Sequence, residues 1–152
     1  MIIYILLLSI LSAVCYRLSG HGGFKGAKLI RRLGCPLIIL ITFWLLKGFN
    51  IYNYGWYILT YILSYLALST YNDWLAPDGT SENWLCWLIT GLFYGLSSFP
   101  LAFYGVSWFS IILRSIVLAG IVTLISEKSD NVFVEEFGRG AIIILTLPIL
   151  LI

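Results

Sequence analysis

The stretch VSWFSIILRSIVLAGIVTLI, residues 106–125, decides the fold class because it is long and apolar enough to cross a bilayer as one helix. A perpendicular helix needs about 20 residues to cross roughly 30 Å of hydrocarbon. Arg114 interrupts this run near its middle, where a guanidinium costs roughly 3 kcal/mol on insertion scales. All seven acidic residues of the chain lie in or beside predicted loops. We therefore expect Arg114 to face inward and to bind backbone carbonyls, hydroxyls, water or an anionic group.

The rest of the chain has the same apolar character. Of its 152 residues, 61% are hydrophobic and 11% are charged, whereas soluble domains average about 45–50% and about 25%. Five further apolar runs cover residues 2–16, 35–52, 55–71, 84–99 and 140–152, and none alternates as a membrane β-strand would. We predict an all-α integral membrane bundle, one domain over residues 1–152 with about six transmembrane helices. Because most runs are short, five full spans and one partial span is the alternative.

The distribution of charge predicts the orientation of these helices in a bacterial inner membrane. Five basic residues lie between the first two apolar runs, and the positive-inside rule assigns them to the cytoplasm. Counting six helices from there places both termini outside. The polar loops 72–83 and 126–139 then also face the cytoplasm.

The first polar loop supplies most of the candidate ligand-binding residues. Its glycines allow backbone N–H groups to converge, and residues 27–33 are expected to form a short basic helix. The loop is either an anchor for anionic lipid headgroups or a cradle for a phosphate-bearing ligand. With a single histidine and no nearby cysteine pair, we predict no metal, no cofactor and no nucleic-acid partner. The candidates, together with Arg114, are Ser19, Gly20, His21, Gly23, Lys25, Lys28, Arg31 and Arg32.

A second set of charged residues is expected to close the cytoplasmic end as a polar cluster. Glu135 and Arg139 stand four residues apart and can pair on one helix face. Glu136 has no local partner, so it is either a functional carboxylate or an ion-pair partner of Arg31 or Arg32. Asp130 or a neighbouring serine is expected to cap the helix that carries them. The members of the cluster are Asp73, Asp78, Glu135, Glu136 and Arg139.

Two patterns inside the apolar runs predict helix packing. Gly91 and Gly95 form a Gly-x-x-x-Gly pair, which lets two helix backbones approach closely, within the chain or between two copies. Tyr57, Tyr61 and Tyr65 recur every four residues and form a stripe. Their hydroxyls either bind neighbouring helices or face a polar cavity shared with Arg114.

One family resemblance lies in the first polar loop. Ser19-Gly20-His21, Gly26-Ala27 and Arg31-x-Leu33-Gly34, followed by Leu46-Lys47-Gly48, resemble the first conserved segment of bacterial acyl-phosphate:glycerol-3-phosphate acyltransferases. That family has an external N-terminus and cytoplasmic motifs. The resemblance implies a lipid-modifying transferase that holds phosphate in this loop.

A second resemblance extends over more of the chain. Tyr16-Arg17-Leu18, the Arg31-Arg32 pair and residues 135–141 are similar to small multispanning membrane proteins of tailed phages and prophages, which implies a setting and no mechanism. The leading hypothesis is a protein without catalytic residues that binds anionic lipid or a membrane-protein partner, with a homo-oligomer as one possibility. The alternatives are the transferase and a small anion transporter or pore that uses Arg114.

Overall fold

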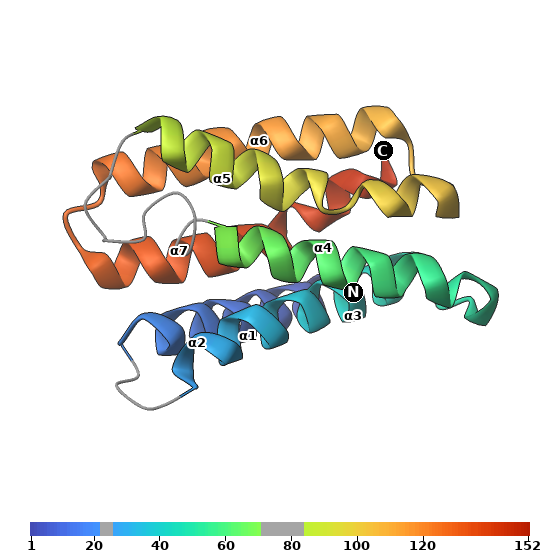
Figure 1. Cartoon of the computed structure of the whole chain (residues 1–152), viewed down its shortest axis with the longest axis horizontal. Coiled ribbons are helices and arrows are strands. Elements are labelled where there is room, and N and C mark those ends of the chain that lie inside the picture. Colours follow the sequence, from blue (N-terminus) through green and yellow to red (C-terminus); the bar gives the residue numbers. More distant parts are fainter. Residues whose placement is uncertain (22–25, 71–83) are drawn as a thin grey trace.

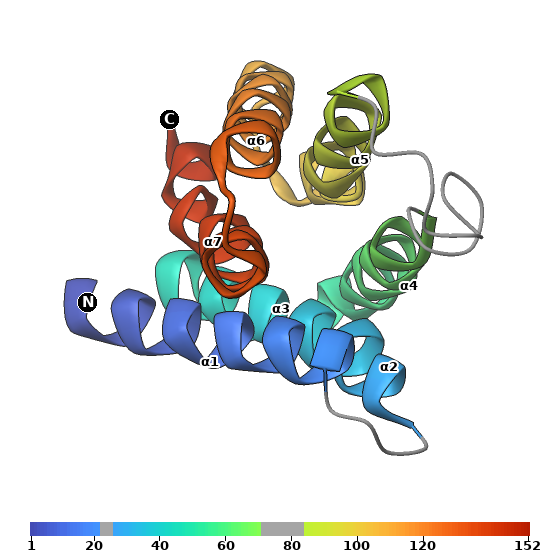
Figure 2. The same cartoon turned by 90° about the vertical axis from the view of Figure 1, so that its left-hand side faces the viewer.

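The computed structural model describes residues 1–21, 26–70 and 84–152, and within these ranges all regular secondary structure is helical. The prediction of an all-α fold is thus confirmed for the described chain. Figure 1 shows α4 to α7 running along one common direction, while Figure 2 shows α1 crossing them obliquely. The six long helices are α1 (Ile2–His21), α3 (Cys35–Lys47), α4 (Tyr54–Thr70), α5 (Trp84–Leu96), α6 (Trp108–Lys128) and α7 (Val132–Leu145).

Four helical stretches are long and apolar enough to cross a membrane. Helices α4 and α7, with 17 and 14 residues, are shorter than these four stretches, two of which join α3 or α5 to the helical turns beside it. The stretches that qualify by length and composition are Ile2–Ser19, Ala27–Lys47, Trp84–Tyr104 and Trp108–Lys128. The chain is therefore a small multispanning helical membrane protein.

The distribution of side chains between surface and interior suits a lipid environment. Large apolar residues face outward on the long helices, and Ile116 in the middle of α6 is 60% exposed. Hydroxyl groups lie inside instead, and most of the buried ones donate a hydrogen bond to the carbonyl three or four residues earlier in the chain. This internal pairing satisfies a buried hydroxyl without water. Examples are Thr42 to Ile38, Thr60 to Trp56, Thr90 to Cys86 and Ser115 to Ile111, at 2.7–2.8 Å.

The first two helices differ from the prediction at the basic loop. Helix α1 continues to His21, so Ser19, Gly20 and His21 are helical and do not belong to a loop. The short helix α2 (Ala27–Leu29) and the π-helical turn η1 (Ile30–Gly34) run directly into α3. The expected short basic helix is therefore the first part of one continuous helix, because no proline or left-handed glycine interrupts residues 27–35.

The last helix begins close to its predicted start. The apolar run begins at residue 140, and α7, which begins at Val132, joins that run to the predicted helix that carries Glu135, Glu136 and Arg139. The side chain of Asn131 accepts a hydrogen bond from the backbone N–H of Phe133 at 2.9 Å, so Asn131 caps the helix and not Asp130 or Ser129. After Leu145 the chain continues as the 3₁₀ helix η5 (Leu147–Leu151).

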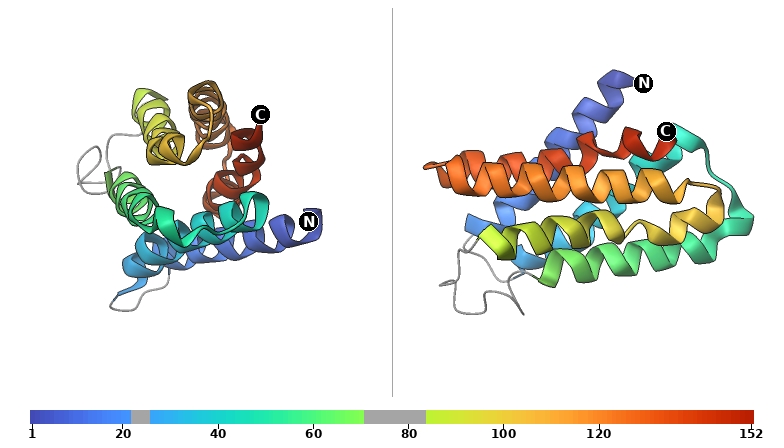
Figure 3. Two further views of the ribbon diagram at one scale, coloured as in Figure 1. Left: turned by 90° about the vertical axis from the view of Figure 1, so that its right-hand side faces the viewer. Right: turned by 90° about the horizontal axis from the view of Figure 1, so that it is seen from above.

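Two pairs of helices pack through glycine. A Cβ added at Gly91 would lie 2.5 Å from the Cα of Ala119, and one added at Gly95 would lie 2.3 Å from the Cα of Ser115, so α5 and α6 meet backbone to backbone (Figure 3). The predicted packing seam is confirmed, and it is intramolecular. Because α6 covers this face, a second copy cannot use it, and the homo-oligomer stays a prediction for other surfaces.

The second seam joins α1 to α7. A Cβ added at Gly140 would lie 2.6 Å from the Cα of Ala13 and 2.9 Å from the carbonyl oxygen of Ser12. The two helices lie side by side although they are distant in sequence. Helix α7 thus connects the first helix to the α5–α6 pair.

Candidate functional site

Charged side chains gather at one end of the bundle. This charged end, on the left of Figure 1, contains the C-terminal ends of α1 and α6, the N-terminal ends of α5 and α7, and α2 with η1. At the opposite end the described residues include a single charged side chain, Lys47, whose Nζ donates to the carbonyl oxygen of Gly105 at 3.1 Å. The segregation of charge expected from the sequence is thus present in the fold.

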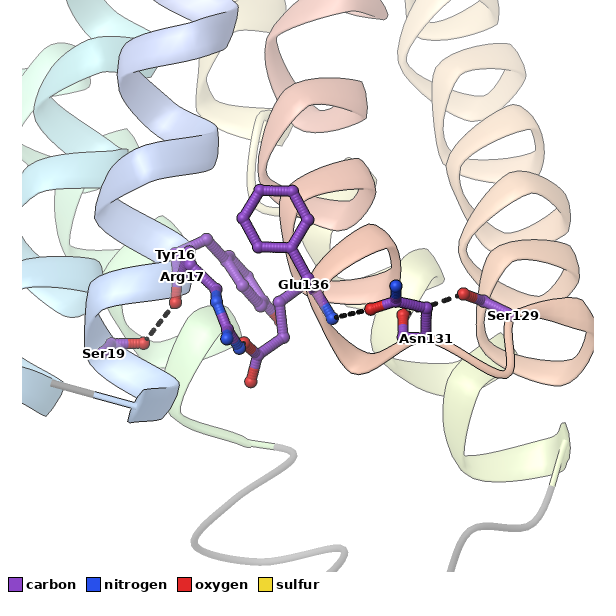
Figure 4. Close-up of polar contacts among 7 residues, drawn as sticks. Tyr16, Arg17, Ser19, Ser129, Asn131 and Glu136 are labelled. Atoms are coloured by element: carbon purple, nitrogen blue, oxygen red, sulfur yellow. Dashed lines mark hydrogen bonds and ion pairs between the residues drawn. The ribbon is translucent and has the colours of Figure 1, made fainter. Parts of the chain in front are cut away.

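An ion pair joins α1 to α7 at the charged end. Nη1 of Arg17 lies 2.6 Å from Oε2 of Glu136, and Figure 4 shows the two side chains meeting between the helices. The Arg17 guanidinium also lies 5.4 Å from the ring centre of Phe133. Glu136 therefore has a partner that the sequence interpretation did not name.

Arg139 connects three helices at the same end. It forms the predicted ion pair with Glu135 one turn earlier on α7, and its Nε donates to Oγ of Ser126 on α6 at 3.0 Å. Its guanidinium lies 3.6 Å from the ring centre of Trp87 on α5, a cation–π contact in a buried position. The local pair was predictable from spacing, while Ser126 and Trp87 were not.

Arg31 lies against a pair of buried tyrosines. Its guanidinium is 5.1 Å from the ring centre of Tyr16, and the Tyr16 hydroxyl lies 3.0 Å from the hydroxyl of Tyr94. Only 7% of Arg31 is exposed, and both rings are buried. These contacts join η1, α1 and α5. Neither tyrosine was predicted as part of a site, although a tyrosine next to Arg17 in an apolar run needs a partner for its hydroxyl.

The rest of the predicted ligand loop does not converge on one point within the described residues. Lys28 is exposed and Arg32 is half-buried on the first turns of the continuous helix. Oγ of Ser19 donates to the carbonyl oxygen of Tyr16 at 2.8 Å, so this hydroxyl is used inside α1. Gly20 and His21 are the last residues of α1. Four other candidates lie outside the described residues: Gly23, Lys25, Asp73 and Asp78.

Arg114 is buried inside the bundle, in the half away from the charged end. It is 0% exposed, and each of its three nitrogens has an acceptor. Nη1 donates to Oγ of Ser98 at 2.6 Å, Nη2 to the carbonyl oxygen of Ile143 at 2.9 Å, and Nε to Oγ1 of Thr146 at 3.3 Å. The expectation of an inward-facing arginine with hydroxyl and carbonyl partners is confirmed.

The tyrosine stripe does not supply these partners, contrary to one of the two interpretations. The Tyr57 hydroxyl accepts a hydrogen bond from the backbone N–H of Asn50 at 3.3 Å, and the Tyr61 hydroxyl donates to the carbonyl oxygen of Leu33 at 3.1 Å. Both contacts join α4 to its neighbours. The stripe therefore packs the bundle, as the other interpretation expected.

The three acceptors of Arg114 come from two places where proline ends a helix. Ser98-Phe99-Pro100 follows α5, and Thr146-Leu147-Pro148 follows α7. Proline has no N–H for the carbonyl four residues earlier, so each α-helix ends and a 3₁₀ helix follows, η4 (Phe99–Tyr104) or η5. This repeated hydroxyl-apolar-proline pattern was the sequence signal for the Arg114 partners.

The described residues contain no group of three or more His, Cys, Asp or Glu side chains able to hold a metal ion. No family model matches the chain, and neither a curated protein nor a solved structure matches it. The resemblances to acyltransferases and to phage membrane proteins therefore stay predictions.

Proposed function

We propose that this chain is a bacterial inner-membrane protein, of the kind carried by phages and prophages, that binds anionic lipid headgroups at its charged end. All six long helices are embedded in the bilayer, with α4 and α7 crossing where it is locally thin. The charged end faces the cytoplasm. In support, the described basic residues before Lys47, which are Arg17, Lys28, Arg31 and Arg32, lie at or near this end, and no acidic residue precedes Asp73 in the sequence.

The observation that carries the proposal is the amphipathic surface of α2 and η1, which we call the basic segment (residues 27–34). Leu29 and Leu33 stand four residues apart and are 48% and 46% exposed. Lys28 and Arg32 alternate with them, the first exposed and the second half-buried. Apolar side chains beside cations suit the boundary between hydrocarbon and headgroups, where each Lys or Arg contributes about 1 kcal/mol of attraction to an anionic surface.

The lipid requirement is tested by thermal unfolding of the full chain in nanodiscs of phosphatidylcholine with and without phosphatidylglycerol. We expect phosphatidylglycerol to raise the melting temperature of the native chain and to raise that of Lys28→Gln/Arg32→Gln much less. Lys128→Gln is the matched control, because Lys128 is exposed at the same end but lies outside the basic segment. An equal response of all three proteins would contradict the proposal.

The orientation is tested separately by cysteine labelling in intact cells, in a background without native cysteines. Asn53→Cys, at the end opposite the charges, should react with an impermeant reagent, and Asp130→Cys should be protected. Labelling of position 130 from outside would invert the topology. It would leave the lipid measurement in nanodiscs unaffected.

Neither alternative function gains support from the geometry. A pore needs its selective charge in contact with water, and Arg114 has no exposed surface. A phosphate cradle needs free donors, and the Ser19 hydroxyl is bound to the carbonyl oxygen of Tyr16. Ion flux into liposomes would support the pore instead of the lipid-binding proposal. Turnover of glycerol-3-phosphate with an acyl donor would support the transferase.

A further inference from the structure

The two proline-broken helix ends around Arg114 have the form of a binding site. We propose that the ends of α5 and α7 constitute a site for a small planar monovalent cation of the guanidinium class, which the Arg114 side chain permanently occupies. The site is independent of the lipid-binding surface, because it lies in the buried interior and shares no residue with the basic segment.

The electrostatics of a helix end favour a cation at this position. The C-terminal end of an α-helix carries roughly half a negative charge. Ile143 belongs to the last turn of α7 and Thr146 caps it, so this helix end meets the guanidinium directly, whereas the end of α5 contributes the hydroxyl of Ser98 two residues beyond it. Among the described residues Arg114 has no ion pair with a carboxylate, and the α7 end and the two hydroxyls bind its guanidinium instead.

The arrangement of the acceptors matches a planar group. The three acceptors bind three different nitrogens of one planar group, at 2.6, 2.9 and 3.3 Å. A compact ammonium or a sodium ion cannot reach three acceptors spaced for a trigonal plane. The site should therefore prefer guanidinium to other monovalent cations.

One turn away on α6, the hydroxyl of Ser110 is an unused acceptor among the described residues. Ser110 lies one turn before Arg114 on α6, is fully buried, and its Oγ has no hydrogen-bond partner among the described residues. Residues four apart share a helix face, so this hydroxyl faces the same region as the guanidinium. A free cation in the space left by a truncated side chain would find a fourth acceptor there.

The test is chemical rescue of Arg114→Ala, a substitution that removes the tethered cation and leaves its acceptors in place. Unfolding of the full chain in detergent is followed with guanidinium chloride, ammonium chloride or sodium chloride at equal ionic strength. A ligand at about ten times its Kd raises the folded-to-unfolded ratio about tenfold, which raises the melting temperature of a chain this size by roughly 3–5 °C. We expect this rise for guanidinium with Arg114→Ala and not with the native chain. Equal rescue by sodium, or none by guanidinium, overturns the proposal.

A second set of variants covers the case in which Arg114→Ala does not fold. Ser98→Ala and Thr146→Ala, in the presence of Arg114, should each lower the melting temperature because each removes one acceptor from the cation. Ser115→Ala is the matched control, since within the described ranges its hydroxyl donates to the carbonyl oxygen of Ile111 in its own helix and does not contact Arg114. If Ser115→Ala costs as much as the other two, the acceptors do not form a cation site.

Discussion

Replacing Gly91 by alanine should force α5 away from α6. The added Cβ would lie 2.5 Å from Cα and 2.8 Å from N of Ala119, and 2.9 Å from the carbonyl oxygen of Leu118. These are backbone atoms, so no side chain can rotate out of the way. Restoring ordinary contact needs a separation of roughly 1 Å, and a gap of that size forfeits up to about half of each dispersion contact across the seam. We expect a steric cost of about 1–3 kcal/mol.

Alanine also favours the helix over glycine by about 1 kcal/mol, which would mask part of this cost. Gly120→Ala measures that gain alone, because Gly120 lies in α6 with open space around its Cβ position. Both variants are unfolded thermally in the same detergent, and the difference between them gives the steric term. If Gly91→Ala is as stable as Gly120→Ala, the close approach of the two helices is refuted.

Three further predictions concern the two ends of the bundle. Arg17→Gln and Glu136→Gln should be non-additive, with a coupling energy of about 0.5–3 kcal/mol in a double-mutant cycle of unfolding, and simple additivity would argue against direct contact. Arg139→Met should cost about 3 kcal/mol, because it breaks a buried ion pair, and should change the fluorescence of Trp87; an unchanged Trp87 spectrum would exclude the stacked geometry. Lys47→Gln should change stability by less than about 1 kcal/mol, because its hydrogen bond is exposed, and a larger loss would show that this contact ties the far end together.

The helical fold was predictable because apolar runs of this length have few alternatives to a membrane helix. The ends of the helices were less predictable from hydropathy alone. Helix α7 begins eight residues before its apolar run, since its first turns carry Glu135 and Glu136, which the fold pairs with arginines. A hydropathy pattern reflects the free-energy cost of placing a charged residue in lipid. It contains no information about an ion-pair partner elsewhere in the chain.

The same limit separates the predicted contacts from the missed ones. Glu135 and Arg139 are four residues apart, so helix geometry alone brings them together. Arg17 and Glu136 are 119 residues apart, and only the packing of α1 on α7 makes them neighbours. The inward direction of Arg114 followed from the cost of burying a charge. Its acceptors depended on where two prolines end two helices, which periodicity does not reveal.

The α1–α7 seam also has a consequence for synthesis of the chain. Ala13 and Tyr16 emerge first, and Gly140, which packs against both, follows more than a hundred residues later. At roughly 5–20 residues per second, the ribosome needs about 6–25 s to deliver α7 after α1. During that interval α1 is already in the bilayer without α7, and Arg17 has not yet formed its ion pair with Glu136. The α1–α7 seam can therefore form only after α7 has been synthesised, and a ribosome stalled before α7 would leave the first helix without its partner and Arg17 accessible to membrane proteases.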